Sequence, residues 1–189
     1  MSANLSTTSY ALLSLLVIDT SQPEAALTGY ELKQRADNTL RFYWVSPAMS
    51  QIYTELDRLS RHDLVEAVDD TSGKRTTRRF RITPHGRESL TTWLRTSADE
   101  FPVLKHPIAL RLMLGSLMGH DEVVAMLDRY VAELAERRRD LEAVREMLGD
   151  NEAVAYPAHV AEWGLAFFDS EADIVERLRE RLSAPDEPA

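Results

Sequence analysis

The segment Gly73–Gly86 places the tightest constraint on the fold, because a turn and a strand pattern meet within it. Ser72-Gly73 is a turn signal between two stretches with strand character. After the turn, Arg79-Phe80-Arg81-Ile82 alternates polar and apolar side chains, as a half-buried strand does. The sequence therefore predicts a β-hairpin with strands at about residues 64–69 and 77–83.

The same hairpin concentrates positive charge. Five of the eight residues 74–81 are lysine or arginine, although the chain of 189 residues has a formal net charge of −9. Residues 41–87 hold nine basic and six acidic residues, a net charge of +3, so the rest of the chain carries −12. The overall negative charge argues against indiscriminate binding of polyanions. A local basic patch of this kind nevertheless indicates where a nucleic acid would dock.

Several protein classes are disfavoured by what the sequence lacks. No run reaches the ~18 apolar residues of a membrane helix, and the N-terminal MSANLSTTSY has no basic start of a secretory signal. There are no cysteines, as is common in the reducing cytoplasm, and the five histidines show no metal-ligand spacing. No catalytic or phosphate-binding motif occurs. We therefore expect a cytoplasmic protein that is not an enzyme, with no membrane, metal or cofactor.

Helical patterns flank the hairpin in a fixed order. Thr28-Gly29-Tyr30-Glu31 has the form of a capping box, and Ser46-Pro47 and Thr83-Pro84 each place proline after an N-cap residue. The expected helices lie at about residues 7–18, 28–38, 46–61 and 84–97. Three helices, a hairpin and a fourth helix follow one another as in a winged helix-turn-helix domain.

The second half of the chain is helical by pattern, with helices at about residues 108–118, 121–148 and 156–182. The middle helix has apolar residues at alternating spacings of four and three, which is typical of a coiled-coil seam that one chain hardly covers alone. The expected fold class is mainly α with a small β-hairpin. Its parts are a winged helix domain (1–98), a junction (99–107), a three-helix dimerisation region (108–183) and a frayed tail (184–189).

Short motifs in the first half of the chain carry a family resemblance. They are Tyr10-Ala11-Leu12-Leu13, Thr28-Gly29-Tyr30-Glu31-Leu32, Trp44, Ser50-Gln51-Ile52-Tyr53, Asp63-Leu64-Val65 and Phe80-Arg81-Ile82-Thr83. In this order and spacing they resemble the PadR family of bacterial transcriptional regulators. The helical second half resembles, by pattern, the longer branch of that family. The resemblance implies repression by occlusion of a promoter. The apolar seam favours a homodimer, whose two-fold symmetry predicts a palindromic operator, and release by a small effector is a hypothesis.

Candidate DNA contacts follow from the third helix and the hairpin. A recognition helix presents short polar side chains near its N-terminus to base edges, and Gln51 is suited to adenine. Arg79 and Arg81 alternate with buried positions, so we expect some pairing with Glu66, Asp69 or Asp70. The candidates are Ser46, Ser50, Gln51, Tyr53 and Thr54 in the third helix, Lys33 in the second, and Lys74, Arg75, Thr76 and Arg78 in the hairpin.

Candidate dimer and effector residues lie in the last two helices. The dimerisation candidates are Val123, Leu127, Tyr130, Leu134, Leu141, Val144, Trp163 and Phe167. Tyr156, Trp163 and Phe168 are candidates for binding an aromatic effector, as in some relatives. An aromatic stripe of this kind is more often core or dimer interface, so both interpretations stay open.

Two other functions also stay open. A winged helix domain can dock proteins without binding DNA, in which case changes at Gln51, Lys74 and Arg75 would leave any nucleic-acid binding unaltered. The sequence argues against a small enzyme with its active site in the aromatic region, because no nucleophile–base pair or carboxylate pair is recognisable.

Overall fold

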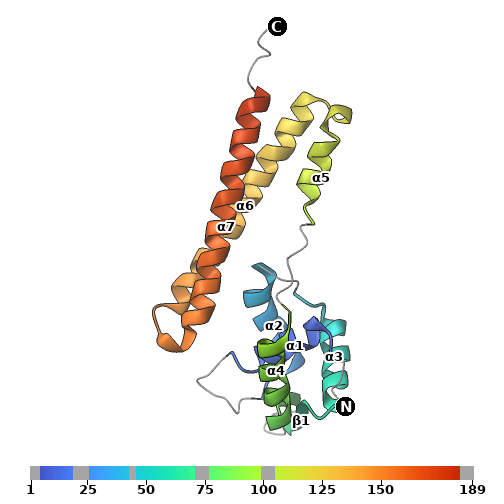
Figure 1. Cartoon of the computed structure of the whole chain (residues 1–189). Helices are drawn as coiled ribbons and strands as arrows, with labels where there is room; N and C mark the ends of the chain where they lie inside the picture. Colours follow the sequence, from blue (N-terminus) through green and yellow to red (C-terminus); the bar gives the residue numbers. More distant parts are fainter. Residues whose placement is uncertain (1–4, 19–25, 43–45, 71–76, 99–104, 184–189) are drawn as a thin grey trace. The chain divides into compact units, whose positions relative to one another are not determined.

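The computed structural model describes residues 5–18, 26–42, 46–70, 77–98 and 105–183, and the chain forms two compact units, residues 1–100 and 101–189 (Figure 1). The predicted fold class is confirmed: the described chain is mostly helical and contains a two-stranded antiparallel hairpin. Lys74, Arg75 and Thr76 lie outside the described residues.

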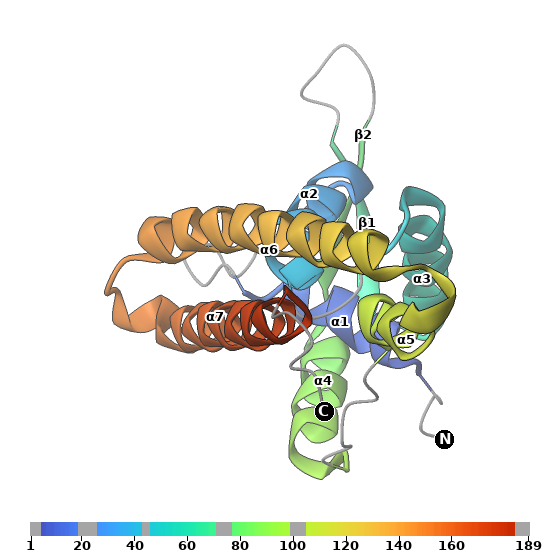
Figure 2. The ribbon, with the colours of Figure 1, turned by 90° about the horizontal axis from the view of Figure 1, so that it is seen from above.

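The first unit contains four α-helices, a short 3-10 helix and the hairpin among its described residues. They are α1 (Thr7–Leu15), α2 (Gly29–Thr39), η1 (Leu40–Phe42), α3 (Met49–Arg61), β1 (Val65–Asp70), β2 (Thr77–Ile82) and α4 (Pro84–Thr96). Strands β1 and β2 lie side by side, with Val65 opposite Ile82 and Asp70 opposite Thr77 (Figure 2). The hairpin predicted from the sequence is confirmed to within one residue.

The core of the first unit joins α1, α2, α3 and the hairpin. Its most deeply buried side chains include Leu12, Leu32, Leu56 and Phe80. Leu27 adds a third extended segment beside β2, because its N–H and C=O both bond the backbone of Phe80, at 2.8 and 2.7 Å. This bridge fixes the base of the hairpin against the chain that leads into α2.

Two of the predicted helix starts are confirmed, and one is wrong. Thr28 and Glu31 form the capping box of α2, and the Thr83 hydroxyl caps α4 by accepting from the N–H of Gly86 at 2.9 Å. Helix α3 begins later than predicted, at Met49, with Ala48 as an N-cap residue that makes no side-chain bond. Ser46 is therefore not its cap, because its hydroxyl is bonded to α2 instead.

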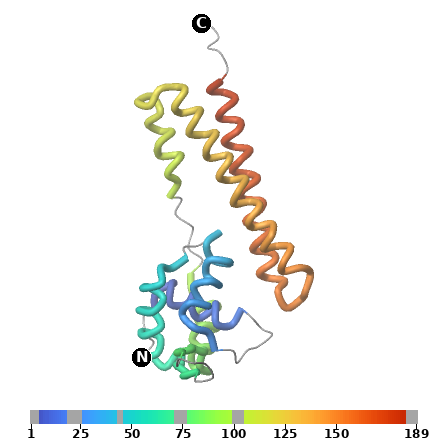
Figure 3. The backbone as a smooth tube through the Cα atoms, turned by 180° about the vertical axis from the view of Figure 1, so that it is seen from behind, coloured from blue at the N-terminus to red at the C-terminus, as the bar shows by residue number. Residues whose placement is uncertain are grey.

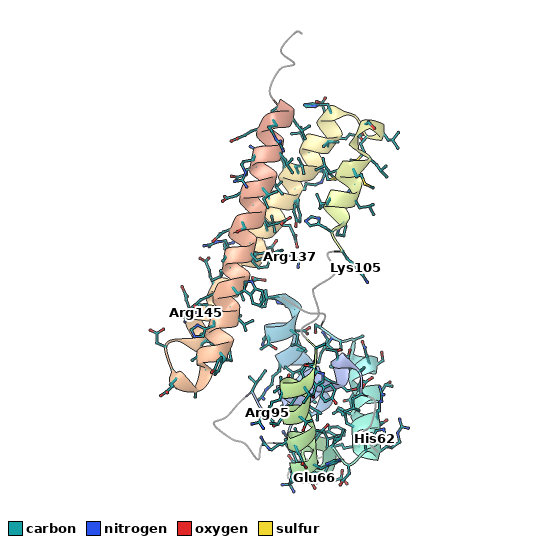
Figure 4. The ribbon with its side chains drawn as sticks, viewed as in Figure 1. His62, Glu66, Arg95, Lys105, Arg137 and Arg145 are labelled. Carbon is teal, nitrogen blue, oxygen red and sulfur yellow. The ribbon has the colours of Figure 1, made fainter. Side chains whose placement is uncertain are left out.

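The second unit is built on a long antiparallel pair of helices. Its elements are α5 (Pro107–Met113), η2 (Gly115–Leu117), α6 (His120–Leu148), η3 (Glu152–Val154) and α7 (Ala155–Ser183). Helices α6 and α7 run side by side over their length (Figure 3). Arg145, labelled in Figure 4, secures the turn between them by donating to Glu162 on α7 at 2.9 Å and to the Gly149 carbonyl at 3.0 Å.

The apolar seam of α6 is covered within the chain, which corrects the argument that one chain can hardly cover it. Val123, Leu127, Leu134 and Leu141 are all buried. Helix α7 approaches α6 closely there, because a Cβ added to Gly164 would lie 2.6 Å from Leu141 Cδ2. The seam is therefore primarily the core of this unit.

Helix α7 leaves most of its large apolar side chains exposed within one chain. Its buried residues are Ala158, Ala161, Phe168 and Val175, whereas the larger Trp163, Phe167 and Ile174 are exposed. Small side chains allow the two helix backbones to approach, and this leaves the bulky apolar residues on the outside.

Candidate nucleic-acid interface

Helix α3 presents a polar face because its opposite face is in the core. Ile52, Leu56 and Leu59 are fully buried, and their spacing of four and three places them on one side. Ser50, Gln51, Tyr53 and Thr54 are exposed on the other side. The structure thus brings four of the predicted base- and phosphate-contacting residues together on the first two turns of α3, where no side chain caps the helix.

Tyr53 is held against the start of α2. A Cβ on Gly29 would lie 2.7 Å from Tyr53 Cζ, so a larger residue there would displace the ring from this position. The tyrosine is still half exposed. From the sequence, Gly29 was assigned only to the capping box. Its second role, leaving space for the Tyr53 ring, depends on a contact between α2 and α3.

The acidic residues of α3 are engaged with neighbours. Glu55 is largely buried and accepts a hydrogen bond from the Ser9 hydroxyl of α1 at 2.5 Å. Asp57 lies 3.8 Å from the Arg78 guanidinium of β2. Each carboxylate of α3 therefore has a hydrogen-bond or ion-pair partner in a neighbouring element.

Two predicted DNA contacts, Lys33 and Ser46, meet at Asp37, which the sequence reasoning missed. Asp37 Oδ1 accepts from Lys33 Nζ, and from the Ser46 hydroxyl at 2.6 Å. Lys33 Nζ also lies 3.0 Å from Ser46 Oγ. The hydrogen bonds from Lys33 and from Ser46 lower the pKa of Asp37. The spacing of four residues between Lys33 and Asp37 on a predicted helix was the feature of the sequence that indicated this ion pair.

Arg79 joins the hairpin to α2. Its guanidinium donates to Asp70 at 3.0 Å, to the Ala26 carbonyl at 3.0 Å and to Glu31 at 3.1 Å. Burial alone would raise the pKa of Glu31, but hydrogen bonds from Thr28 and the charge of Arg79 outweigh it, and the pKa is lowered. Arg79 is thus a structural residue at the base of the hairpin.

The other described arginines of β2 differ in their partners. Arg81 pairs with Glu66 on β1, as was expected for the outer face of the hairpin. Arg78 is more than half exposed and lies over the Phe80 ring at 5.1 Å from its centroid. An exposed ion pair such as Arg78–Asp57 contributes little stability, so Arg78 remains available to a phosphate.

The candidate effector residues lie on two faces of α7. Tyr156 and Trp163 are 84% and 76% exposed, whereas Phe168 is 7% exposed. Phe167 bridges the two faces through an edge contact with Phe168, with centroids 6.0 Å apart. Within one chain these side chains do not enclose a ligand, and their proposed role stays a prediction.

Two of the dimerisation candidates on α6, Tyr130 and Val144, are half buried. The Tyr130 hydroxyl lies 3.3 Å from His106 Nε2 and 3.3 Å from Glu171, and His106 Nε2 lies 2.6 Å from the same carboxylate. Burial and the Glu171 charge raise the pKa of Tyr130 to about 12. This polar cluster connects the N-cap of α5 and the N-terminal half of α6 with α7.

Two findings concern other classes of site. Among the described residues, no group of three or more histidine, aspartate or glutamate side chains is arranged to hold a metal ion. No helix in the described ranges is both long enough and apolar enough to span a membrane.

Comparisons with known proteins give one family and several similar folds. Residues 15–92 match the transcriptional regulator PadR-like family. A PadR-like transcriptional regulator from Bacillus cereus is 18% identical over 97% of this chain and 99% of that chain, with a TM-score of 0.77. Bacillus subtilis PadR in complex with operator DNA is 19% identical over 94% and 100%, with a TM-score of 0.81.

Bacillus subtilis PadR has also been solved in complex with p-coumaric acid, and that structure is 20% identical over 95% of this chain and 100% of that chain, with a TM-score of 0.73. A comparison with curated protein sequences finds no match. The structural likeness extends through the helical second half of the chain, beyond the residues that the family match covers.

Proposed function

Because residues 15–92 form a PadR-like family domain, as the sequence motifs predicted, we propose that the protein is a DNA-binding transcriptional regulator that represses from a palindromic operator. The observation that carries the proposal is the exposed polar face of α3, where Ser50, Gln51 and Thr54 project from a helix whose other face is core. Such a helix fits the major groove of DNA. A regulator acts where the chromosome lies, so the proposed location is the cytoplasm, and no catalytic activity is proposed.

The proposed DNA surface combines α3 with the hairpin. Gln51 is assigned to a base edge, Tyr53 to a phosphate, and Arg78 to the backbone beside the hairpin. Lys74, Arg75 and Thr76 complete the assignment as backbone or minor-groove contacts of the hairpin. The Bacillus subtilis relative solved with operator DNA supports this assignment, because its fold matches this chain with a TM-score of 0.81.

The proposed assembly is a homodimer formed through the second unit. Leu110, Met113 and Leu117 of the α5–η2 segment are exposed, as are Trp163 and Phe167 of α7. Exposed apolar residues in this number are typical of a protein interaction surface. A two-fold dimer places two α3 helices on half-sites one or more helical turns apart, in steps of ~34–36 Å, which accounts for a palindromic operator.

A small aromatic effector is proposed as the releasing ligand. Among the candidate effector residues of α7, Tyr156 and Trp163 are exposed, and a dimer partner would help to enclose them. The relative solved with p-coumaric acid supports an aromatic ligand class. If operator affinity were the same with and without a ligand that binds the protein, this part of the proposal would fail.

The proposal is tested by binding of the full chain to DNA from upstream of its own gene, against a scrambled fragment, at two salt concentrations. Wild type is expected to prefer the cognate fragment, and Lys74→Ala/Arg75→Ala to weaken binding and reduce the salt slope by ~0.9 for each phosphate that the variant no longer neutralises. Leu94→Ala, an exposed change on α4, is the control. A wild-type chain with no preference for the cognate fragment, together with a double variant that behaves the same, would favour a protein-docking winged helix instead.

A further inference from the structure

Lys33, Asp37 and Ser46 form a closed polar triangle between α2 and the segment that precedes α3. Lys33 and Asp37 lie one turn apart on α2 and are ion-paired. The Ser46 hydroxyl donates to Asp37 Oδ1 at 2.6 Å and lies 3.0 Å from Lys33 Nζ. Each member thus bonds the other two, and Asp37 is the acceptor for both.

The start of α3 needs an anchor of this kind because its cap provides none. Ala48, the N-cap residue, makes no side-chain hydrogen bond. Ser46 stands two residues earlier and is the described side chain of this segment that bonds α2. Pro47, between them, is buried. The segment that leads into α3 is therefore tied to α2 through the bond between Ser46 and Asp37.

The number of hydrogen-bond donors restricts what Ser46 and Lys33 can still do. A serine hydroxyl has one proton to donate, and Ser46 donates it to Asp37. A lysine ammonium has three N–H donors, and Lys33 directs two of them at Asp37 and Ser46. One Lys33 donor is left for a phosphate, whereas Ser46 has no proton left for a base or a phosphate.

We propose that Asp37 is a positioning residue for DNA recognition: by holding Ser46, it sets where α3 begins and so directs Ser50 and Gln51 toward the base edges. The inference rests on the proposed function, and it reassigns Ser46 from a DNA contact to a member of this anchor. Asp37 contributes through geometry, although it is a negative charge on the side of the protein that faces a polyanion.

Geometry and charge predict opposite results for Asp37→Ala. If Asp37 acts only as a charge, its removal raises the affinity for every DNA, because repulsion is lost and Lys33 is freed. If Asp37 positions α3, the preference for operator over scrambled DNA falls, by about tenfold for the loss of one charged hydrogen bond, while affinity for scrambled DNA stays equal or rises. An equal gain on both DNAs would overturn the proposal.

Two further variants sharpen the test. Asp37→Asn keeps an oxygen that can accept from Ser46, so it is expected to retain most of the operator preference. Glu88→Ala removes an exposed negative charge from α4 of the same unit and is expected to leave the preference unchanged. An Asp37→Asn variant as impaired as Asp37→Ala would contradict the role of the Ser46 hydrogen bond.

A double-mutant cycle tests whether Asp37 acts through Ser46. Residues that act as one unit give non-additive effects. Ser46→Ala/Asp37→Ala is therefore expected to lose no more operator preference than Asp37→Ala alone. Additive losses would mean that Ser46 contacts DNA independently, and would overturn the reassignment.

Amide hydrogen exchange in the DNA-free protein separates this inference from the proposed function. Asp37→Ala is expected to speed exchange in the first bonded turn of α3, at residues 52–54, where the N–H of Ile52 is the first to bond within the helix, while Leu56 and Leu59 in the core retain their protection. Unchanged exchange at residues 52–54 would overturn the anchor. A wild-type chain with no operator preference, but with exchange altered by Asp37→Ala, would refute the proposed function and leave the anchor standing.

Discussion

The two units differ in how far they bury their apolar side chains. In the first unit, α1, α2, α3 and the hairpin bury theirs in one cluster around Leu12, Leu56 and Phe80, and the exposed face of α3 is polar. In the second unit, α5 buries no residue completely, and α7 exposes Trp163 and Phe167. This is the contrast expected of the proposed DNA surface on the first unit and the proposed dimer interface on the second.

The largest expected effect lies in the core of the first unit. Leu56→Ala removes a fully buried side chain and is expected to lower the free energy of unfolding by about 2–5 kcal/mol, because transfer energy is lost and a cavity remains. Urea unfolding of the full chain measures it, with amide exchange of α3 reporting the first unit. Leu94→Ala, 65% exposed on α4, is the matched control, and an equal loss there would contradict the contrast between buried and exposed leucines.

A second prediction concerns the close contact of α6 and α7. Gly164→Val places atoms where Leu141 lies, since even a Cβ would be 2.6 Å from Leu141 Cδ2. Overpacking of this kind costs about 1–3 kcal/mol, measured by urea unfolding with amide exchange in α6. Ala166→Val, at an exposed position of the same helix, should change stability far less. Equal effects would mean that α7 does not face α6 through Gly164.

The exposed face of α7 gives a third prediction. Trp163→Ala is expected to raise the dissociation constant of the proposed homodimer about 30-fold, which corresponds to roughly 2 kcal/mol for an aromatic interface residue. Sedimentation at several protein concentrations measures it, with circular dichroism to show that the helices persist. Glu176→Ala, exposed on the same helix, is the control. A wild-type chain that sediments as a monomer would contradict the assembly.

The fourth and smallest effect is a pH dependence at the base of the hairpin. The pKa of Glu31 is lower in the folded protein than its ordinary value of 4.5, so the folded state binds this proton less tightly than the unfolded state does. The stability that Glu31 contributes is therefore present above pH 4.5 and is lost as the pH falls through the folded pKa.

Urea unfolding of wild type and Glu31→Gln between pH 7 and pH 3 measures this effect. The difference between the two proteins is expected to be largest near neutral pH and to shrink below pH 4.5. Glu88→Gln, an exposed change on α4, is the control. A difference that grows toward pH 3 would contradict the role of the carboxylate in the capping box and in the Arg79 ion pair.

The first unit was largely predictable from its sequence because its patterns are local. The alternation in Arg79-Phe80-Arg81-Ile82 identified a strand of the hairpin, and Thr28-Gly29-Tyr30-Glu31 identified a helix start. The start of α3 was missed because Ser46 had two possible partners. Its hydroxyl bonds the Asp37 carboxylate nine residues earlier rather than the backbone of α3.

The packing of the second unit was less predictable because α7 carries two sets of residues with helical periodicity. Large residues such as Trp163 and Phe167 made one face conspicuous, but Ala158 and Ala161 lie against α6. Small residues occupy that contact because they let the helices approach, as Gly164 does at Leu141. Sequence periodicity finds both faces and does not show which one the chain covers itself.

The central claim is that α3 recognises a specific DNA sequence, and the most direct test is selection of bound fragments from genomic DNA by the wild-type chain and by Gln51→Ala. The account predicts that wild type enriches a palindrome whose half-sites are separated by whole helical turns, and that Gln51→Ala loses its preference at one position of each half-site while affinity for the remaining positions persists. Enrichment of no common sequence by wild type, or of the same sequence with unchanged base preference by Gln51→Ala, would contradict it.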